Sequence, residues 1–190
     1  MAKTSEVKER KITKSELKIL LRNAEIDIVS NDKAQLIYKC PTTHQEMYLD
    51  EYGDTESVTI DFLQSMKTKA KSFFTKYWIV IEDVYVPNSE LGITVEDVYD
   101  FLGLSSVYKN LKDFDCDYLD NILNRDKIEK FKDRIENMDK KMVVQLISRA
   151  VELYKNGEFT DSSKMLVLED IADNEYLFKE ANLKSKKSKK

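Results

Sequence analysis

The chain has 190 residues, of which 42 % are hydrophobic and 35 % charged, and its 31 basic and 35 acidic residues give a net charge of -4. This length and apolar content fit one folded domain or two small ones, whereas the net charge argues against a protein that binds nucleic acid over its whole surface, because such domains are usually basic. Four glycines and two prolines predict few tight loops and a largely regular backbone.

Residues 1–12 at the N-terminus are polar with alternating charge, and we expect a flexible arm there. Thr13 and Glu16 then fit a capping box, in which the hydroxyl accepts from a backbone N–H one turn on and the carboxylate reaches back. The apolar run that follows predicts a short helix over 14–23, although the same run also fits a strand.

Short segments with the pattern of strands come next. Residues 25–30 alternate polar and apolar side chains, which places every second one on the same face of a sheet. Residues 34–39 and 46–50 are predicted strands bounded by turns, and 56–60 fits a further brief strand. Two hairpins of this length suit a small antiparallel sheet.

Apolar residues recur at three- and four-residue spacing from Phe62 to Phe74, which predicts a helix over 61–73 with one apolar face. Residues 77–86 then form the densest run of β-branched and aromatic residues in the chain, and Pro87 closes it. We interpret this run as the last strand of a β-rich module and as its junction with a helical module.

From residue 88 onward the apolar spacing is helical. Thr94 suits a helix N-cap, and Gly157 suits a helix end. The predicted helical segments are 94–102, 105–111, 118–123, 126–137, 139–156 and one that starts at 161 or 162, with a pattern that permits extension through Phe178. Helices this short do not stay folded alone, so their apolar stripes must pack against each other or against the sheet.

The predicted fold class is α+β: a small N-terminal antiparallel sheet or partial barrel with one inserted helix, followed by a C-terminal helical bundle. The predicted division is a flexible charged arm (1–12), a β-rich module with helices (13–87), a helical module (88–183) and a disordered lysine-rich tail (184–190).

The tail contains lysine and serine only, and without its five lysines the net charge falls from -4 to -9. The remainder of the chain is therefore distinctly acidic. Such a tail can bind nucleic acid or an acidic protein surface, or serve solubility alone. The candidate contact residues are Lys184, Lys186, Lys187, Lys189 and Lys190.

No constellation in the sequence predicts a catalytic, metal or cofactor site. His44, the only histidine, stands in a predicted turn, and a nucleophilic triad needs a base held against an orienting acid. The acids between Asp113 and Asp120 alternate as in a calcium loop, but Tyr118 stands at the glycine position and Asn124 at the final ligand position. These acids suit helix N-termini instead.

Two other features allow both a functional and a purely structural interpretation. Glu82 and Asp83 end the predicted 77–86 strand, where paired acids sometimes hold a metal, but no partner ligands can be named. The lysines within 67–76 precede Trp78 and could contact a phosphate backbone. A solvated helix face explains these lysines more simply.

Cys40 and Cys116 lie in different predicted modules without further ligands nearby, and we expect reduced structural thiols. The N-terminus shows no apolar run typical of a signal peptide. No stretch approaches the roughly 20 apolar residues that a membrane span needs. We therefore expect synthesis in a cytosol and no membrane partner.

Short motifs spread over residues 25–172 form a pattern without catalytic residues. They are Tyr48-Leu49-Asp50-Glu51-Tyr52-Gly53-Asp54, Ile60-Asp61-Phe62-Leu63 with Phe73-Phe74, Trp78-Ile79-Val80-Ile81-Glu82-Asp83, Leu102-Gly103-Leu104 with Tyr108-Lys109-Asn110, and Gly157 with Asp161-Ser162. With these motifs the chain resembles small proteins encoded among the structural genes of tailed phages of low-GC Gram-positive bacteria. The resemblance implies a non-enzymatic virion structural or assembly protein, made in the bacterial host cytoplasm, that contacts itself or other virion proteins. It carries over no site residues.

A nucleic-acid-binding regulator is the alternative class. Residues 94–111 have the length of a helix–turn–helix with Gly103 in the turn, but the second helix would hold only Lys109 and Lys112 as cations. A weaker alternative is a metal-dependent enzyme that uses the acids at the end of the 77–86 strand.

Overall fold

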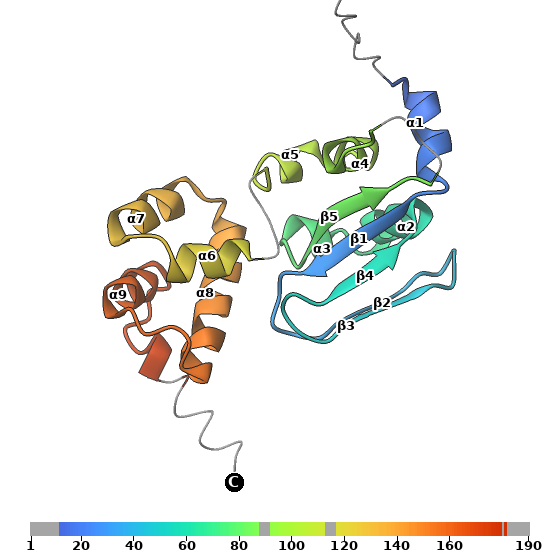
Figure 1. The fold of residues 1–190 in the computed structure, drawn as a ribbon. Helices are drawn as coiled ribbons and strands as arrows, with labels where there is room; N and C mark the ends of the chain where they lie inside the picture. Colours follow the sequence, from blue (N-terminus) through green and yellow to red (C-terminus); the bar gives the residue numbers. More distant parts are fainter. Residues whose placement is uncertain (1–11, 88–91, 113–116, 180, 182–190) are drawn as a thin grey trace, which may run out of the picture.

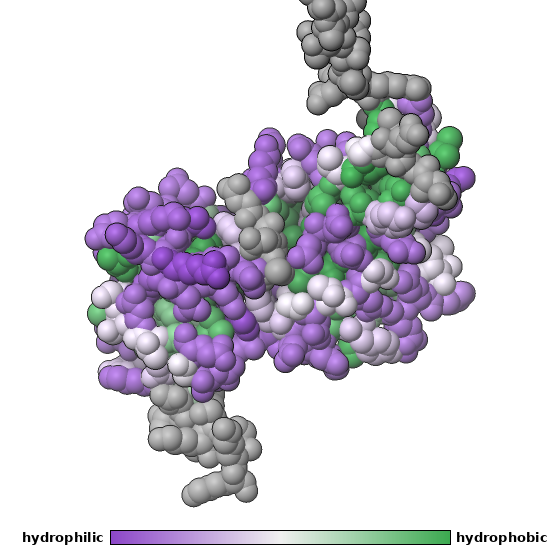
Figure 2. Space-filling view, viewed as in Figure 1, coloured by the Kyte–Doolittle hydropathy of each residue, from purple (hydrophilic) through white to green (hydrophobic). Residues whose placement is uncertain are grey.

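The computed structural model describes residues 12–87, 92–112, 117–179 and 181. The predicted arm, apart from Ile12, and the whole of the predicted tail lie outside these residues. The fold is α+β: strands of the N-terminal half form a small antiparallel sheet, and helices follow in the C-terminal half (Figure 1). On the face shown in Figure 2, hydrophilic residues cover most of the C-terminal helices, and apolar residues gather over the sheet half.

The elements in chain order are α1 (Lys14–Leu21), β1 (Glu25–Ser30), β2 (Leu36–Lys39), β3 (Glu46–Leu49), β4 (Thr55–Val58), α2 (Ile60–Lys69), α3 (Ser72–Thr75), β5 (Ile79–Tyr85), α4 (Val95–Phe101), α5 (Ser105–Tyr108), α6 (Tyr118–Asn124), α7 (Ile128–Asn137), α8 (Lys140–Asn156) and α9 (Ser162–Ile171).

Of the two predicted hairpins, the one formed by 34–39 and 46–50 is confirmed as the pair β2 and β3. Among the described residues, β1 lies in the centre of an antiparallel sheet with the order β4-β1-β5, while β2 and β3 pair with each other as a separate hairpin. The predicted pairing of 25–30 with 34–39 is therefore wrong. Ile28, Val29 and Ser30 are buried in succession, and consecutive buried positions are typical of a strand covered on both faces.

The predicted helix over 61–73 is interrupted. α2 ends at Lys69, and Ala70 leaves the helical region with φ -141° and ψ 47°. After this break Phe74 is fully buried, while Phe73 packs edge-on against Trp78 with 5.5 Å between ring centroids. The break therefore lets two consecutive aromatic side chains pack in different directions.

The predicted strand over 77–86 starts two residues late, at Ile79. Tyr77 has a φ of +57°, a left-handed conformation that a strand cannot contain and that a bulky residue rarely adopts. Two contacts hold it: Asn31 Nδ2 donates to the Tyr77 carbonyl at 2.9 Å, and Asn110 Nδ2 donates to the Tyr77 hydroxyl at 2.7 Å.

The predicted helix starts are confirmed where a polar side chain caps the helix. Thr13 caps α1 and Thr94 caps α4, each with a complete capping box, and this settles the first apolar run as helix rather than strand. Asp139 caps α8 and Asp161 caps α9. The predicted extension of the last helix through Phe178 is wrong, because α9 ends at Ile171.

α4 and α5 pack with the sheet rather than with the helices that follow them. α4 contacts α1 and β5, and Figure 1 shows α4 and α5 beside β5. The buried Tyr99 hydroxyl of α4 accepts a hydrogen bond from the Ile81 N–H at 3.0 Å. These helices thus lie beyond the predicted boundary at residue 88 but share the core of the sheet half.

Replacement of Gly157 with alanine is expected to lower the free energy of unfolding by about 1–2 kcal/mol. Gly157 ends α8 with a φ of +81°, and no atom lies within 4 Å of an added Cβ, so the cost is conformational rather than steric. Urea unfolding measures it, with Gly92→Ala as the control, because Gly92 has similar space and no left-handed φ. Equal effects of the two substitutions would contradict this explanation.

Candidate protein-docking surface

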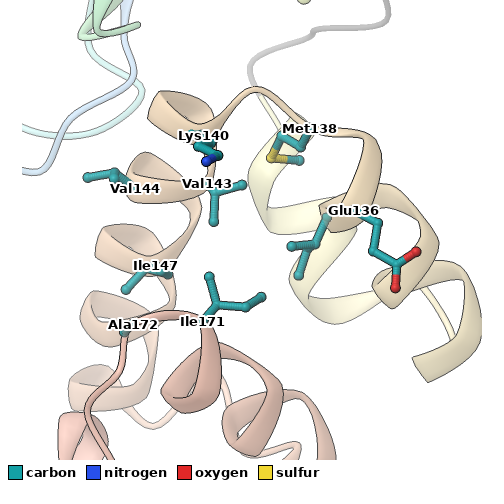
Figure 3. Close-up of a pocket in the computed structure, with 9 residues that line it drawn as sticks. Glu136, Met138, Lys140, Val143, Val144, Ile147, Ile171 and Ala172 are labelled. Atoms are coloured by element: carbon teal, nitrogen blue, oxygen red, sulfur yellow. The ribbon is translucent and has the colours of Figure 1, made fainter.

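An open apolar groove lies where α7, α8 and the end of α9 meet (Figure 3). Its volume is about 720 Å³. Seven of its lining residues are apolar, namely Ile135, Met138, Val143, Val144, Ile147, Ile171 and Ala172, and the charged residues Glu136 and Lys140 complete the lining. We refer to this feature as the α7–α9 groove.

The local sequence explains how α8 forms the floor of the α7–α9 groove. The Asp139 cap fixes the start of α8, and Val143 and Ile147 follow at i and i+4 on one helix face. In Figure 3 the side chains of Val143 and Ile171 project into the space between the three helices. Val144, which also lines the groove, points away from this space and is 60 % exposed, and Ile171 is 43 % exposed.

The charged residues in and near the α7–α9 groove are of both signs. Glu136, in the last turn of α7, and Lys140, in the first turn of α8, both line it. A separate hollow of about 380 Å³ after the end of α9 has a lining that includes Glu169, Asp170, Asp173 and Glu175.

A partly buried ion pair fixes α8 against its neighbours. Arg149 of α8 donates from Nε and Nη2 to the two carboxylate oxygens of Asp120 in α6, at 2.7 and 2.8 Å, and Nη1 lies 3.1 Å from Glu152. Its guanidinium lies 4.0 Å from the ring centroid of Tyr52, in the β3–β4 turn. Burial alone would lower the pKa of Arg149, but its hydrogen bonds and charge interactions with Asp120 and Glu152 raise it.

Two buried amides attach α8 to the turn before β5. Gln145 Nε2 donates to the Lys76 carbonyl at 3.2 Å, and Asn31 Nδ2 donates to the carbonyl of the next residue, Tyr77. Asn31 also contacts the sulfur of Met142 on α8. The floor of the α7–α9 groove is therefore connected to the sheet by specific polar contacts.

The sequence-predicted contact lysines of the tail, Lys184 to Lys190, lie outside the described residues, as do Asp113, Asp115 and Cys116. The acids that are described do not converge. Asp120 binds Arg149, and Glu82 and Asp83 are exposed on β5. Among the described residues no group of three or more histidine, cysteine or acidic side chains could hold a metal ion.

Of the lysines in residues 67–76, Lys76 makes a cation–π contact, with its Nζ 4.9 Å from the Trp78 ring centroid. His44 is exposed in a turn with a φ of 58°.

In the predicted helix–turn–helix, α5 has a single turn and buries Val107. A helix of one turn is too short to place several side chains along a major groove.

Sequence reasoning missed the α7–α9 groove, because Val144 and Ile171 resemble ordinary core residues in the sequence. The signal that could have revealed it is the width of the apolar stripe on α8. Val143 and Val144 are consecutive apolar residues, and a single packing face at helical spacing needs only one of them.

No protein-family model, curated protein or solved structure matches this chain. In the part of the chain that the structure describes, every helix is too short or too polar to cross a membrane.

Cys40 is a buried thiol at the end of β2. Burial raises its pKa, but hydrogen bonds with Ser65 and Thr43 outweigh this effect and lower the pKa from 9.0 to about 7. The Thr43 N–H donates to Sγ at 3.4 Å.

We expect the stability that Cys40 contributes to rise between pH 7 and pH 9. In this interval the folded thiol has lost its proton while the unfolded thiol still holds one, so the unfolded state binds more protons and stability increases with pH. Urea unfolding of wild type and Cys40→Ala under reducing conditions should give a difference that grows with pH. A constant difference across this range would contradict the lowered pKa.

Proposed function

We propose that this chain is a non-enzymatic structural or assembly protein of a phage virion, which acts by docking other virion proteins or copies of itself. The observation that carries this proposal is the α7–α9 groove with its exposed Val144 and Ile171. Contiguous exposed apolar surface on a folded protein typically marks a site of protein–protein contact. The virion setting rests on the motif resemblance alone.

In this proposal the chain works by presenting a preformed surface. The Arg149–Asp120 pair and the amides of Asn31 and Gln145 hold α8 in place, so little ordering of the groove is needed when a partner binds. The protein is made in the host cytoplasm and incorporated into the particle. The lysine-rich tail would add a contact to nucleic acid or to an acidic protein surface.

Quantitative mass spectrometry of particles released by cells that encode the chain tests this proposal. We expect the chain at a fixed ratio to the major particle proteins after density-gradient purification and a high-salt wash. Its absence from the particles, with the chain recovered only in the soluble fraction, would refute the virion assignment.

A further inference from the structure

β2 is the outermost strand of the sheet half. Among the described strands it pairs with β3 alone. β3 lies beside β4, where the Tyr48 N–H donates to Glu56 Oε2 at 3.0 Å and Gln45 Nε2 donates to the Ser57 carbonyl at 3.3 Å. The other side of β2 is therefore an open strand edge, and Figure 1 shows the β2–β3 hairpin at the margin of the sheet half.

The hydrogen bonds of the hairpin determine which backbone groups β2 presents at this edge. The Cys40 N–H donates to the Gln45 carbonyl at 2.9 Å, whereas the Tyr48 N–H donates to β4. Because bonded and non-bonded pairs alternate along antiparallel strands, the N–H and C=O groups of Ile37 and Lys39 point away from β3. Groups in this position are a template for one more extended strand.

The exposed face of the hairpin carries an apolar row that ends at the same edge. Ile37 lies opposite Tyr48 on β3, and the two side chains are 46 % and 49 % exposed. Cross-strand apolar pairs stabilise a sheet when the next strand continues them. An added strand is therefore favoured if it places an apolar side chain beside Ile37.

Polar rows lie on both sides of this apolar row. Lys39 pairs with Glu46 across the hairpin at 2.7 Å. Two residues before Ile37, Gln35 Nε2 donates to Asp50 Oδ1. The strand that fits this edge must therefore meet a cation on one side of Ile37 and an amide backed by a carboxylate on the other.

A second copy of the chain meets these conditions in one antiparallel register. Two-fold symmetry centred on Ile37 places this residue opposite Ile37 of the other copy, so the apolar row continues through four side chains. Lys39 then lies opposite Gln35 of the other copy, beyond which stands Asp50. A shift by two residues would place Lys39 opposite Ile37, and a shift by four would place two lysines opposite each other, which destabilises a sheet.

We propose that two copies of the chain associate through their β2 edges in this register and form a continuous sheet with the order β3-β2-β2-β3. This inference rests on the proposed function, because it specifies how the contact between copies is made, and it uses a surface other than the α7–α9 groove. A two-fold contact uses the same edge on both copies, so the association closes at a dimer. Because β2 has four residues, the interface is small, and the dimer depends on concentration.

Sedimentation equilibrium of the full chain over a range of concentrations tests the proposal. We expect a monomer–dimer equilibrium in the wild type. Ile37→Glu and Ile37→Lys should each weaken the dimer about tenfold or more, because each substitution places like charges directly opposite one another. Ile19→Glu is the matched control, because Ile19 is 64 % exposed on α1, outside the hairpin. Circular dichroism verifies that each variant is folded.

An equimolar mixture of Ile37→Glu and Ile37→Lys tests the register itself. The mixture should restore the dimer, because the carboxylate of one variant lies opposite the ammonium group of the other only where position 37 pairs with itself. A wild type that stays monomeric, equal weakening by Ile19→Glu, a dimer that the variants at position 37 leave unchanged, or a mixture that stays monomeric would overturn the proposal.

The edge pairing and the proposed function fail separately. A dimer with these properties, formed by a chain that is absent from particles, would refute the proposed function and leave the edge pairing standing. A chain that is incorporated into particles but stays monomeric in solution would overturn the edge pairing and leave the proposed function standing.

Discussion

Replacement of Phe131 with alanine is expected to lower the free energy of unfolding by about 3–5 kcal/mol. The Phe131 ring is fully buried on α7. Its removal leaves a cavity, and folded domains have only about 5–15 kcal/mol of stability in total.

The environment of Phe131 adds a second cost, because a buried charge lies against its ring. Lys164 Nζ is 5.4 Å from the ring centroid and donates to the Leu123 carbonyl at 2.6 Å. Truncation of the ring removes a favourable neighbour of this ammonium group. α7 also forms one wall of the α7–α9 groove, so we expect the variant to disturb this surface as well.

Urea unfolding followed by circular dichroism measures the effect of Phe131→Ala. Phe131→Leu should cost only about 1 kcal/mol, because it retains most of the volume, and Leu166→Ala on the surface should change stability by less than about 0.5 kcal/mol. A loss below about 1.5 kcal/mol for Phe131→Ala would mean that the core of the α6–α9 half is not packed as described.

Replacement of Arg149 with alanine is expected to cost about 2 kcal/mol. Breaking a fully buried ion pair costs about 3–5 kcal/mol, and partial exposure of the two side chains, 15 % for Arg149 and 28 % for Asp120, reduces this value. The substitution leaves Asp120 without its bidentate partner and removes the guanidinium from the Tyr52 ring.

The Arg149 variant also tests the connection between the sheet and the C-terminal helices. Trp78, the only tryptophan in the chain, reports on the sheet half by fluorescence, whereas circular dichroism reports mainly on the helices. We expect the two unfolding curves to coincide in the wild type and to separate in Arg149→Ala.

A double-mutant cycle with Asp120→Ala should give a coupling energy of about 1–2 kcal/mol, and an energy near zero would show that the pair stabilises nothing.

The sequence predicted well the features that depend on a few neighbouring residues. Thr13 with Glu16 and Thr94 with Asp97 satisfy backbone N–H groups within one turn, so a short motif is sufficient to define each helix start. Gly157 likewise ends α8 through its own backbone conformation.

Features that depend on distant residues could not be predicted. β1 pairs with β4 and β5 rather than with the next strand, and no local pattern specifies that choice. The left-handed Tyr77 is held by Asn31 and Asn110, which lie 46 and 33 residues away in the chain. Among the described residues of the α7–α9 groove, Val144 and Ile171 remain exposed, and an apolar stripe in the sequence does not show which of its residues stay uncovered.

The copy number of groove variants in purified particles tests the central claim most directly. Leu166→Asp is the control, because Leu166 is exposed on α9 and does not line the groove. We predict that wild type and Leu166→Asp are incorporated at the same fixed ratio to the major particle proteins, while Val144→Asp is depleted about tenfold. Equal incorporation of all three chains would contradict docking through the α7–α9 groove, and absence of all three would contradict a place in the particle.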